Sequence, residues 1–202
     1  MKLKDLFNLR RPIKGLIGHH GLGRWWGNEL TELDRTRILE VFHPTTAAAD
    51  SLLEGDIYSS ESPVAFLTNL AGWLRKDSDR TIGYKVLAKA EQLVGCSADV
   101  LDKHFFFQQK LEMHYRDRAI PSELAEAERA CLCQVGISSA AAIAFQKESS
   151  GPLPEHAGYA RLLRILKERG AMEEVLSLSE RAKSEGWSGP WAEPVTSGPR
   201  HK

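Results

Sequence analysis

The feature that most constrains this chain is a pair of amphipathic segments, joined by a glycine, between His156 and Trp187. In both segments, apolar or small residues recur at the i, i+3, i+4, i+7 spacing of a helix with one buried face. They are Tyr159, Leu162, Leu163 and Leu166, followed by Met172, Val175, Leu176, Ser179 and Ala182. Gly170 stands where the first helix must end, because glycine tolerates the left-handed conformation of a helix C-terminus. The pattern predicts two antiparallel helices that share a buried face.

The rest of the chain shows the same helical period, and no stretch has the period-2 alternation of a half-buried strand. We therefore predict an all-α fold of about eight helices arranged as antiparallel hairpins. Thr31 can cap one helix, His43-Pro44 ends it, and Ser62-Pro63 opens the next. The predicted helix pairs are 32–42 with 63–75, 80–94 with 98–117, 122–135 with 140–147, and 155–169 with 172–185.

These pairs place one helical domain over residues 30–187. Residues 1–29 are predicted to form a basic arm and hinge, because residues 18–23 are rich in glycine. Residues 188–202 are rich in proline, glycine and serine, which predicts a disordered tail.

Composition narrows the class of protein. The chain is 42% hydrophobic and 27% charged with a formal net charge of zero, which is typical of a soluble globular protein and does not favour nucleic-acid binding. No apolar run reaches the roughly 18 residues that a membrane-spanning helix needs. Three cysteines are too few for a disulfide framework, which favours a reducing, cytoplasmic location.

Charge is concentrated at the N-terminus. Residues 1–24 hold six basic residues against Asp5, a formal charge of +5, so the remainder carries −5. Arg10, Arg11 and Pro12 interrupt the apolar run that a signal peptide would need. The segment is interpreted either as an arm that packs its leucines on the domain, or as a contact to an acidic partner or a membrane surface.

The C-terminal pair of helices resembles the tetratricopeptide repeat over about 32 residues. The matching positions are Tyr159, Leu162, Leu166, Gly170 and Ala182. Residues 83–87 repeat the G-Y-x-x-L pattern of residues 158–162, and so suggest internal repetition. The resemblance implies an irregular, right-handed stack of hairpins whose concave face binds a peptide or a partner helix. Because binding residues vary within that family, it implies packing positions only.

Catalytic patterns are scarce. The chain has no phosphate-binding glycine loop, no G-x-S-x-G turn and no H-E-x-x-H pair. Asp99, Asp102 and His104 remain as candidate helical ligands of a metal-dependent hydrolase, although acidic residues at a helix start also suit the helix dipole. Cys131 and Cys133 point about 200° apart on a helix, so we predict small buried side chains and no metal.

The tryptophans allow two interpretations. Tryptophan is enriched at binding hot spots, but it can equally cover the apolar end of a helical stack. We favour the covering role for Trp187. The candidates for contact with a partner are Trp25, Trp26, Arg10 and Arg11. The leading hypothesis is a scaffold that binds another protein or peptide, without cofactor or catalytic activity. The alternatives are the metal-dependent hydrolase and a membrane-surface protein held by the basic arm.

Overall fold

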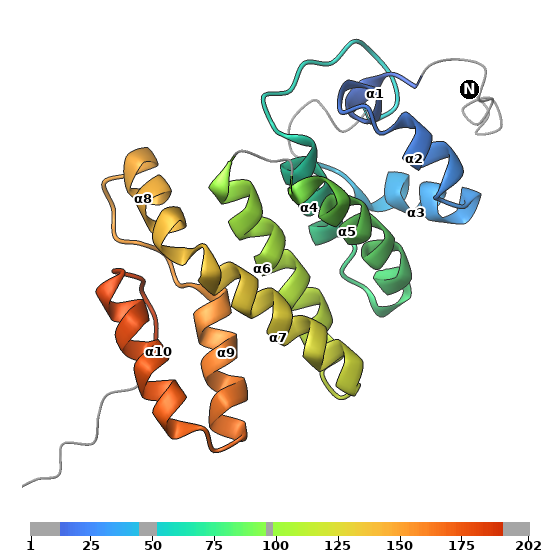
Figure 1. The fold of residues 1–202 in the computed structure, drawn as a ribbon. Helices are drawn as coiled ribbons and strands as arrows, with labels where there is room; N and C mark the ends of the chain where they lie inside the picture. The colour runs from blue at the N-terminus through green and yellow to red at the C-terminus, as the bar shows by residue number, and fades with distance from the viewer. Residues whose placement is uncertain (1–12, 45–51, 96–98, 192–202) are drawn as a thin grey trace, which may run out of the picture. The chain divides into compact units, whose positions relative to one another are not determined.

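The computed structural model describes residues 13–44, 52–95 and 99–191, and these residues confirm the all-α fold (Figure 1). The described residues hold no β-strand, only an isolated bridge between Glu155 and Ser188. The chain divides into two compact units, Met1–Ser97 and Ala98–Lys202, whereas the sequence predicts a single domain over residues 30–187. No helix in the described ranges combines the length and the apolar character that a membrane crossing requires.

Unit 1 contains five α-helices within its described residues. They are α1 (Gly15–His19), α2 (Gly23–Asn28), α3 (Glu32–Val41), α4 (Pro63–Trp73) and α5 (Arg80–Val94). Helices α4 and α5 pack most extensively on each other. Residues 15–28 differ from the predicted arm and hinge, because Leu22, Trp25 and Trp26 have i, i+3, i+4 spacing and are buried. The many glycines of this stretch favour a loop by composition, so the sequence does not predict these helices.

Two caps fix the helix starts in unit 1. The Asp34 amide donates to Thr31 Oγ1 at 3.2 Å, and the Thr31 amide donates to Asp34 Oδ2 at 2.9 Å, which completes a capping box for α3. The Ala65 amide donates to Ser62 Oγ at 3.1 Å at the start of α4. The predicted helix starts at residues 32 and 63 are therefore confirmed.

Unit 2 contains the remaining helices of the described residues. They are α6 (Val100–Arg116), α7 (Pro121–Gly136), α8 (Ser138–Glu148), α9 (Ala157–Glu168) and α10 (Met172–Ser184). Helix α7 packs mainly on α6 and α9, and α8 packs mainly on α6 (Figure 1). This differs from the predicted pairing of 122–135 with 140–147. Only Ile137 separates α7 from α8, so the chain has no room to turn back on itself as a hairpin.

The C-terminal helices follow the predicted bounds closely. Gly170 has a φ of +76°, and the Ala171 amide donates to Leu166 O at 3.0 Å across the turn between α9 and α10. Gly186 follows the end of α10 and has a φ of +85°. The chain reverses there, and the next residue, Trp187, is buried in unit 2. Residues 188–191 are part of the described fold, although the predicted tail begins at 188. Residues 192–202 lie outside the described residues.

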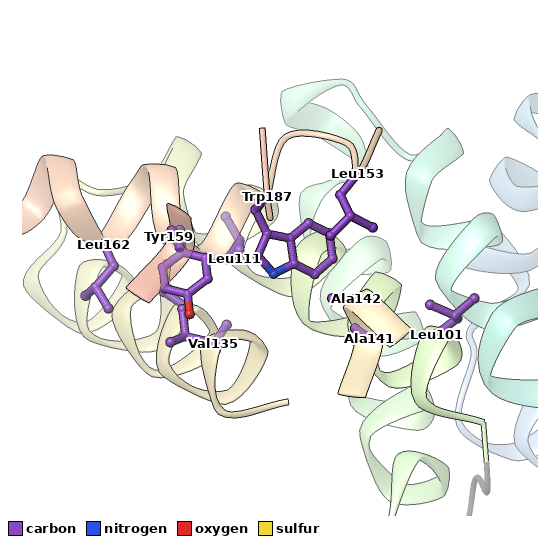
Figure 2. Packing of buried hydrophobic residues seen from close by; sticks show 12 residues of the cluster. Leu101, Leu111, Val135, Ala141, Ala142, Leu153, Tyr159, Leu162 and Trp187 are labelled. Carbon is purple, nitrogen blue, oxygen red and sulfur yellow. The ribbon is translucent and has the colours of Figure 1, made fainter. Parts of the chain in front are cut away.

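The core of unit 2 draws side chains from every one of its helices (Figure 2). Its buried members are Leu101, Leu111, Ala130, Cys131, Val135, Ala141, Ala142, Leu153, Tyr159, Leu162, Ala182 and Trp187. The Trp187 indole therefore packs within the unit, against residues of several helices. From the sequence we expect Trp187 to fold back on the last helix and to cover the end of the stack.

Candidate functional site

Two buried histidines and one tryptophan form an aromatic cluster inside unit 2. His104 of α6 is 2% exposed and His156, the N-cap of α9, is 0% exposed, and their ring centroids are 5.0 Å apart. The His104 ring stacks on Trp187 at 5.5 Å with an interplanar angle of 6°. The His156 ring meets the same indole at 4.7 Å and 80°. The cluster ties α6 and the start of α9 to the segment that follows α10.

Gln134 of α7 fixes the hydrogen bonding of this cluster. Its Oε1 accepts from the Gly158 amide at 2.7 Å, so its Nε2 is the donor. That Nε2 donates to His104 O at 3.0 Å and lies 3.3 Å from His104 Nε2. His156 Nδ1 accepts from the Tyr159 amide at 3.2 Å. Each imidazole thus offers a lone pair to a neighbouring N–H group, which requires the neutral form of the ring.

Burial keeps both histidines uncharged. Desolvation lowers the pKa of His104 to about 4. Desolvation, followed by the proximity of His104, lowers the pKa of His156 to about 3. At neutral pH these imidazoles serve as packed, hydrogen-bonded interior groups.

The candidate metal ligands do not come together. Asp99 is the N-cap of α6, and its Oδ1 accepts from the Leu101 amide at 2.8 Å. His104 lies in the interior beside Gln134, while Asp102 is only half-buried. Across the residues that the structure describes, no group of three or more His, Cys, Asp or Glu side chains could hold a metal ion.

The sequence candidates for partner contact fall elsewhere. Trp25 and Trp26 are each 2% exposed, so their indoles belong to the interior of unit 1 and present no surface to a partner. Arg10 and Arg11 lie outside the described residues. None of these four residues contributes to a surface that the structure describes.

The cysteine prediction is correct for one residue of the pair. Cys131 is buried in the core of unit 2, as the sequence predicts, and desolvation raises the pKa of its thiol to about 12. Cys133 is exposed on α7, and the prediction of a buried side chain is wrong there. A separation of two residues places the two thiols on different faces of the helix, so only one of them reaches the core.

Glu185, directly after α10, is held by several donors. Its side chain is 11% exposed. Tyr159 Oη donates to Oε2 at 2.9 Å and Trp187 Nε1 donates to Oε2 at 3.2 Å. Ser139 Oγ donates to Oε1 at 2.7 Å and Arg181 Nε donates to Oε1 at 3.0 Å. Burial alone would raise the pKa of Glu185, but these donors lower it to about 2.

A groove of about 560 Å³ lies between α9 and α10. Its lining residues are Leu162, Leu166, Glu173, Glu174, Ser177, Leu178 and Arg181. Leu162 is buried, whereas Leu166 and Leu178 are half-buried and leave apolar surface open to solvent. Of the predicted packing positions, Tyr159, Leu162 and Ala182 are buried, and Leu166 both touches the core and lines the groove.

The charged residues of the groove are in different situations. Arg181 donates to Glu185 and, at 3.0 Å, to Val135 O, so its charge is compensated within unit 2. Glu173 and Glu174 stand in the first turn of α10 and are exposed. Neither carboxylate has a hydrogen bond or an ion pair to another described residue. The groove therefore combines an apolar floor with two open negative charges.

No protein-family model, curated protein or solved structure significantly matches this chain.

Proposed function

We propose that this protein binds peptides or helical segments of other proteins, and that the groove between α9 and α10 is its binding surface. The observation that carries the proposal is the apolar floor of the groove, in which Leu162 is the buried base and Leu166 and Leu178 are partly open to solvent. A volume of about 560 Å³ falls within the range of about 300–1,000 Å³ that is typical of ligand sites. Docking of an amphipathic helix into an apolar groove is a recurring mode of peptide recognition.

The apolar floor supplies the driving force. Leu166 and Leu178 are partly exposed, so a partner that covers them removes apolar surface from water. This transfer contributes roughly 25 cal/mol for each Å² of apolar surface that is buried. Leu162 is already buried and forms the fixed base of the groove.

The groove is supported on its inner side. Arg181 links α10 to the end of α7 through its bond to Val135 O at 3.0 Å, and it also bonds Glu185. The turn at Gly170 joins the other ends of α9 and α10. A groove held at both ends loses little freedom when a ligand binds, which favours affinity.

A selection from a library of random 12-residue peptides tests the proposal. The selected peptides are measured against the unaltered chain, Leu178→Glu and the matched control Leu132→Glu, which places the same change on the exposed face of α7. We expect Leu178→Glu to weaken binding at least tenfold and Leu132→Glu to leave it unchanged.

A second variant separates a loss of binding from a loss of folding. Leu178 also touches the core, whereas Ser177 is exposed and lines the groove, so Ser177→Trp fills the groove from the solvent side. Circular dichroism checks that each variant is folded. The proposal is wrong if the selection enriches no peptide, or if folded Ser177→Trp binds the selected peptides as tightly as the unaltered chain.

A further inference from the structure

We infer that the groove between α9 and α10 selects an amphipathic segment that carries two apolar side chains about one helical turn apart, flanked by lysine or arginine. This inference rests on the proposed function and adds the chemistry of the partner. It depends on three observations. They are the negative sign of the uncompensated charge, the spacing of the leucines on the groove floor, and the pairing of the Arg181 charge with Glu185.

The uncompensated charge of the groove is negative. Glu173 and Glu174 line it, are exposed, and have no ion pair to another described residue. Arg181 is the cation of the lining, but Glu185 holds it at 3.0 Å. A basic partner therefore meets two available carboxylates, whereas an acidic partner is repelled.

The spacing of the leucines matches a helical ligand. Leu162 and Leu166 are four residues apart on α9, so their side chains lie on one face of that helix, about 6 Å apart along its axis. Leu178 faces the same groove from α10. Two apolar side chains at i and i+3 or i+4 of a partner helix have the spacing to pack between these residues.

The size of the expected preference for basic over neutral peptides follows from the exposure of the Glu173 and Glu174 carboxylates. An exposed ion pair strengthens binding only about two- to fivefold, and salt screens it. Two such pairs give about a tenfold preference for basic over neutral flanks at low ionic strength, falling towards twofold at high salt. The apolar pair supplies most of the affinity, and the charges supply the choice of partner.

A local explanation for the two glutamates makes a different prediction. Acidic residues in the first turn of a helix stabilise it through the helix dipole. If that were the only role of Glu173 and Glu174, reversing their charge would lower the stability of α10 without changing the preference among peptides.

Three synthetic 15-residue peptides test the inference. They share one pair of leucines at i and i+4, and they carry four flanking lysines, glutamines or glutamates. Their binding to the full chain is measured by fluorescence anisotropy in 50 mM and 300 mM NaCl. We expect the lysine peptide to bind about tenfold more tightly than the glutamine peptide at low salt, and the glutamate peptide to bind most weakly.

Charge reversal supplies the matched control. The double variant Glu173→Lys/Glu174→Lys is expected to prefer the glutamate peptide. Glu29→Lys/Glu32→Lys makes the same change in net charge on exposed residues of unit 1 and is expected to keep the original preference. An unchanged preference for lysine in the Glu173→Lys/Glu174→Lys variant overturns the inference.

A fourth peptide separates the two proposals. It is the lysine-flanked peptide with serine in place of both leucines. Equal binding of the lysine and glutamine peptides, with loss for the serine peptide, contradicts the charge selection and leaves the groove as a peptide site. Binding of the serine peptide as tight as that of the lysine peptide, or no binding by any leucine peptide, contradicts the proposed function itself.

Discussion

Glutamates at the two ends of α10 have opposite surroundings. Glu185 follows the helix and accepts hydrogen bonds from Tyr159, Trp187 and Arg181, among others. Glu173 and Glu174 stand in the first turn of the helix and are exposed, with no such partner in the described part of the chain. The same side chain is structural where its acceptor capacity is filled, and it is available to a ligand where its capacity is open beside apolar surface.

The comparison extends to the surroundings of each end. The end at Glu185 adjoins the closed cluster of His104, His156 and Trp187, in which aromatic rings contact one another. The face at Glu173 and Glu174 adjoins leucines that remain partly exposed. We therefore expect changes at the closed end to alter stability, and changes at the open face to alter binding.

Among the substitutions, the largest effect on stability is expected at Trp187. Trp187→Ala removes an indole that is 3% exposed and stacked on His104, so it should lower the free energy of unfolding by about 3–5 kcal/mol. Trp73→Ala, at an indole that is 37% exposed, is the control and should cost far less. Urea unfolding followed by circular dichroism measures both. A loss below about 1 kcal/mol for Trp187→Ala would show that the cluster is not a structural centre.

The next effect compares the glutamates directly. Glu185→Gln removes the charge that the surrounding donors satisfy, and should cost on the order of 2 kcal/mol. Glu174→Gln alters an exposed carboxylate and should change stability by less than about 0.5 kcal/mol. Urea unfolding at pH 7 measures the pair. Similar losses for both variants would contradict the division into a closed and an open end.

Lowering the pH should lower the free energy of unfolding, because His104 and His156 are buried in the uncharged form. The pKa values of His104 and His156 are about 4 and about 3 in the fold, and near 6.5 when the chain is unfolded. The unfolded state therefore binds more protons below pH 6.5. Stability should fall as the pH drops from 6.5 to about 4, by up to about 1.4 kcal/mol per pH unit for each histidine. Urea unfolding between pH 7.5 and pH 4.5 measures this slope.

His156→Asn sharpens that test. Asparagine is a favoured N-cap, so it can still accept the Tyr159 amide at the start of α9. The variant lacks one titrating group and should show a shallower slope between pH 6.5 and pH 4.5. A slope equal to that of the unaltered chain would assign the acid sensitivity to other groups, such as His20, whose pKa burial lowers to about 4.

A smaller destabilisation is expected in the turn between α9 and α10. Gly170 has a φ of +76° and open space where an alanine methyl group would stand, so Gly170→Ala should cost about 1–2 kcal/mol through its backbone conformation alone. Gly136 has the same open space without the positive φ, and Gly136→Ala should stabilise by about 0.5 kcal/mol. Thermal unfolding measures both, and the same sign for the two variants would contradict this explanation.

Local signals in the sequence predicted the helices well, because caps and breakers act over a few residues. Thr31, Ser62 and Gly170 each define a boundary that the structure confirms. The sequence pattern does not predict the short helices α1 and α2, because glycines interrupt the helical spacing of Leu22, Trp25 and Trp26. Whether the hairpins form a tetratricopeptide-like array stays a prediction.

The candidate site could not be predicted from local signals. Glu185 receives donors from Ser139, Tyr159 and Trp187, which are brought together only by the packing of α8, α9 and α10. Leu178 falls outside the stripe of residues that marks the buried face of its helix, so it reads as an ordinary surface leucine. In the sequence, Glu173 and Glu174 are acidic residues of a first helical turn, which the helix dipole already explains. Only the structure shows that they line a groove.

Methyl NMR of leucine-labelled protein, titrated with the lysine-flanked peptide, tests most directly whether the groove binds peptides. We expect the methyl signals of Leu162, Leu166 and Leu178 to shift with the peptide, and those of Leu132 on α7 and Leu33 on α3 to stay in place. Shifts at Leu132 or Leu33 with unchanged signals for the three groove leucines would place the binding surface elsewhere and contradict the proposed function.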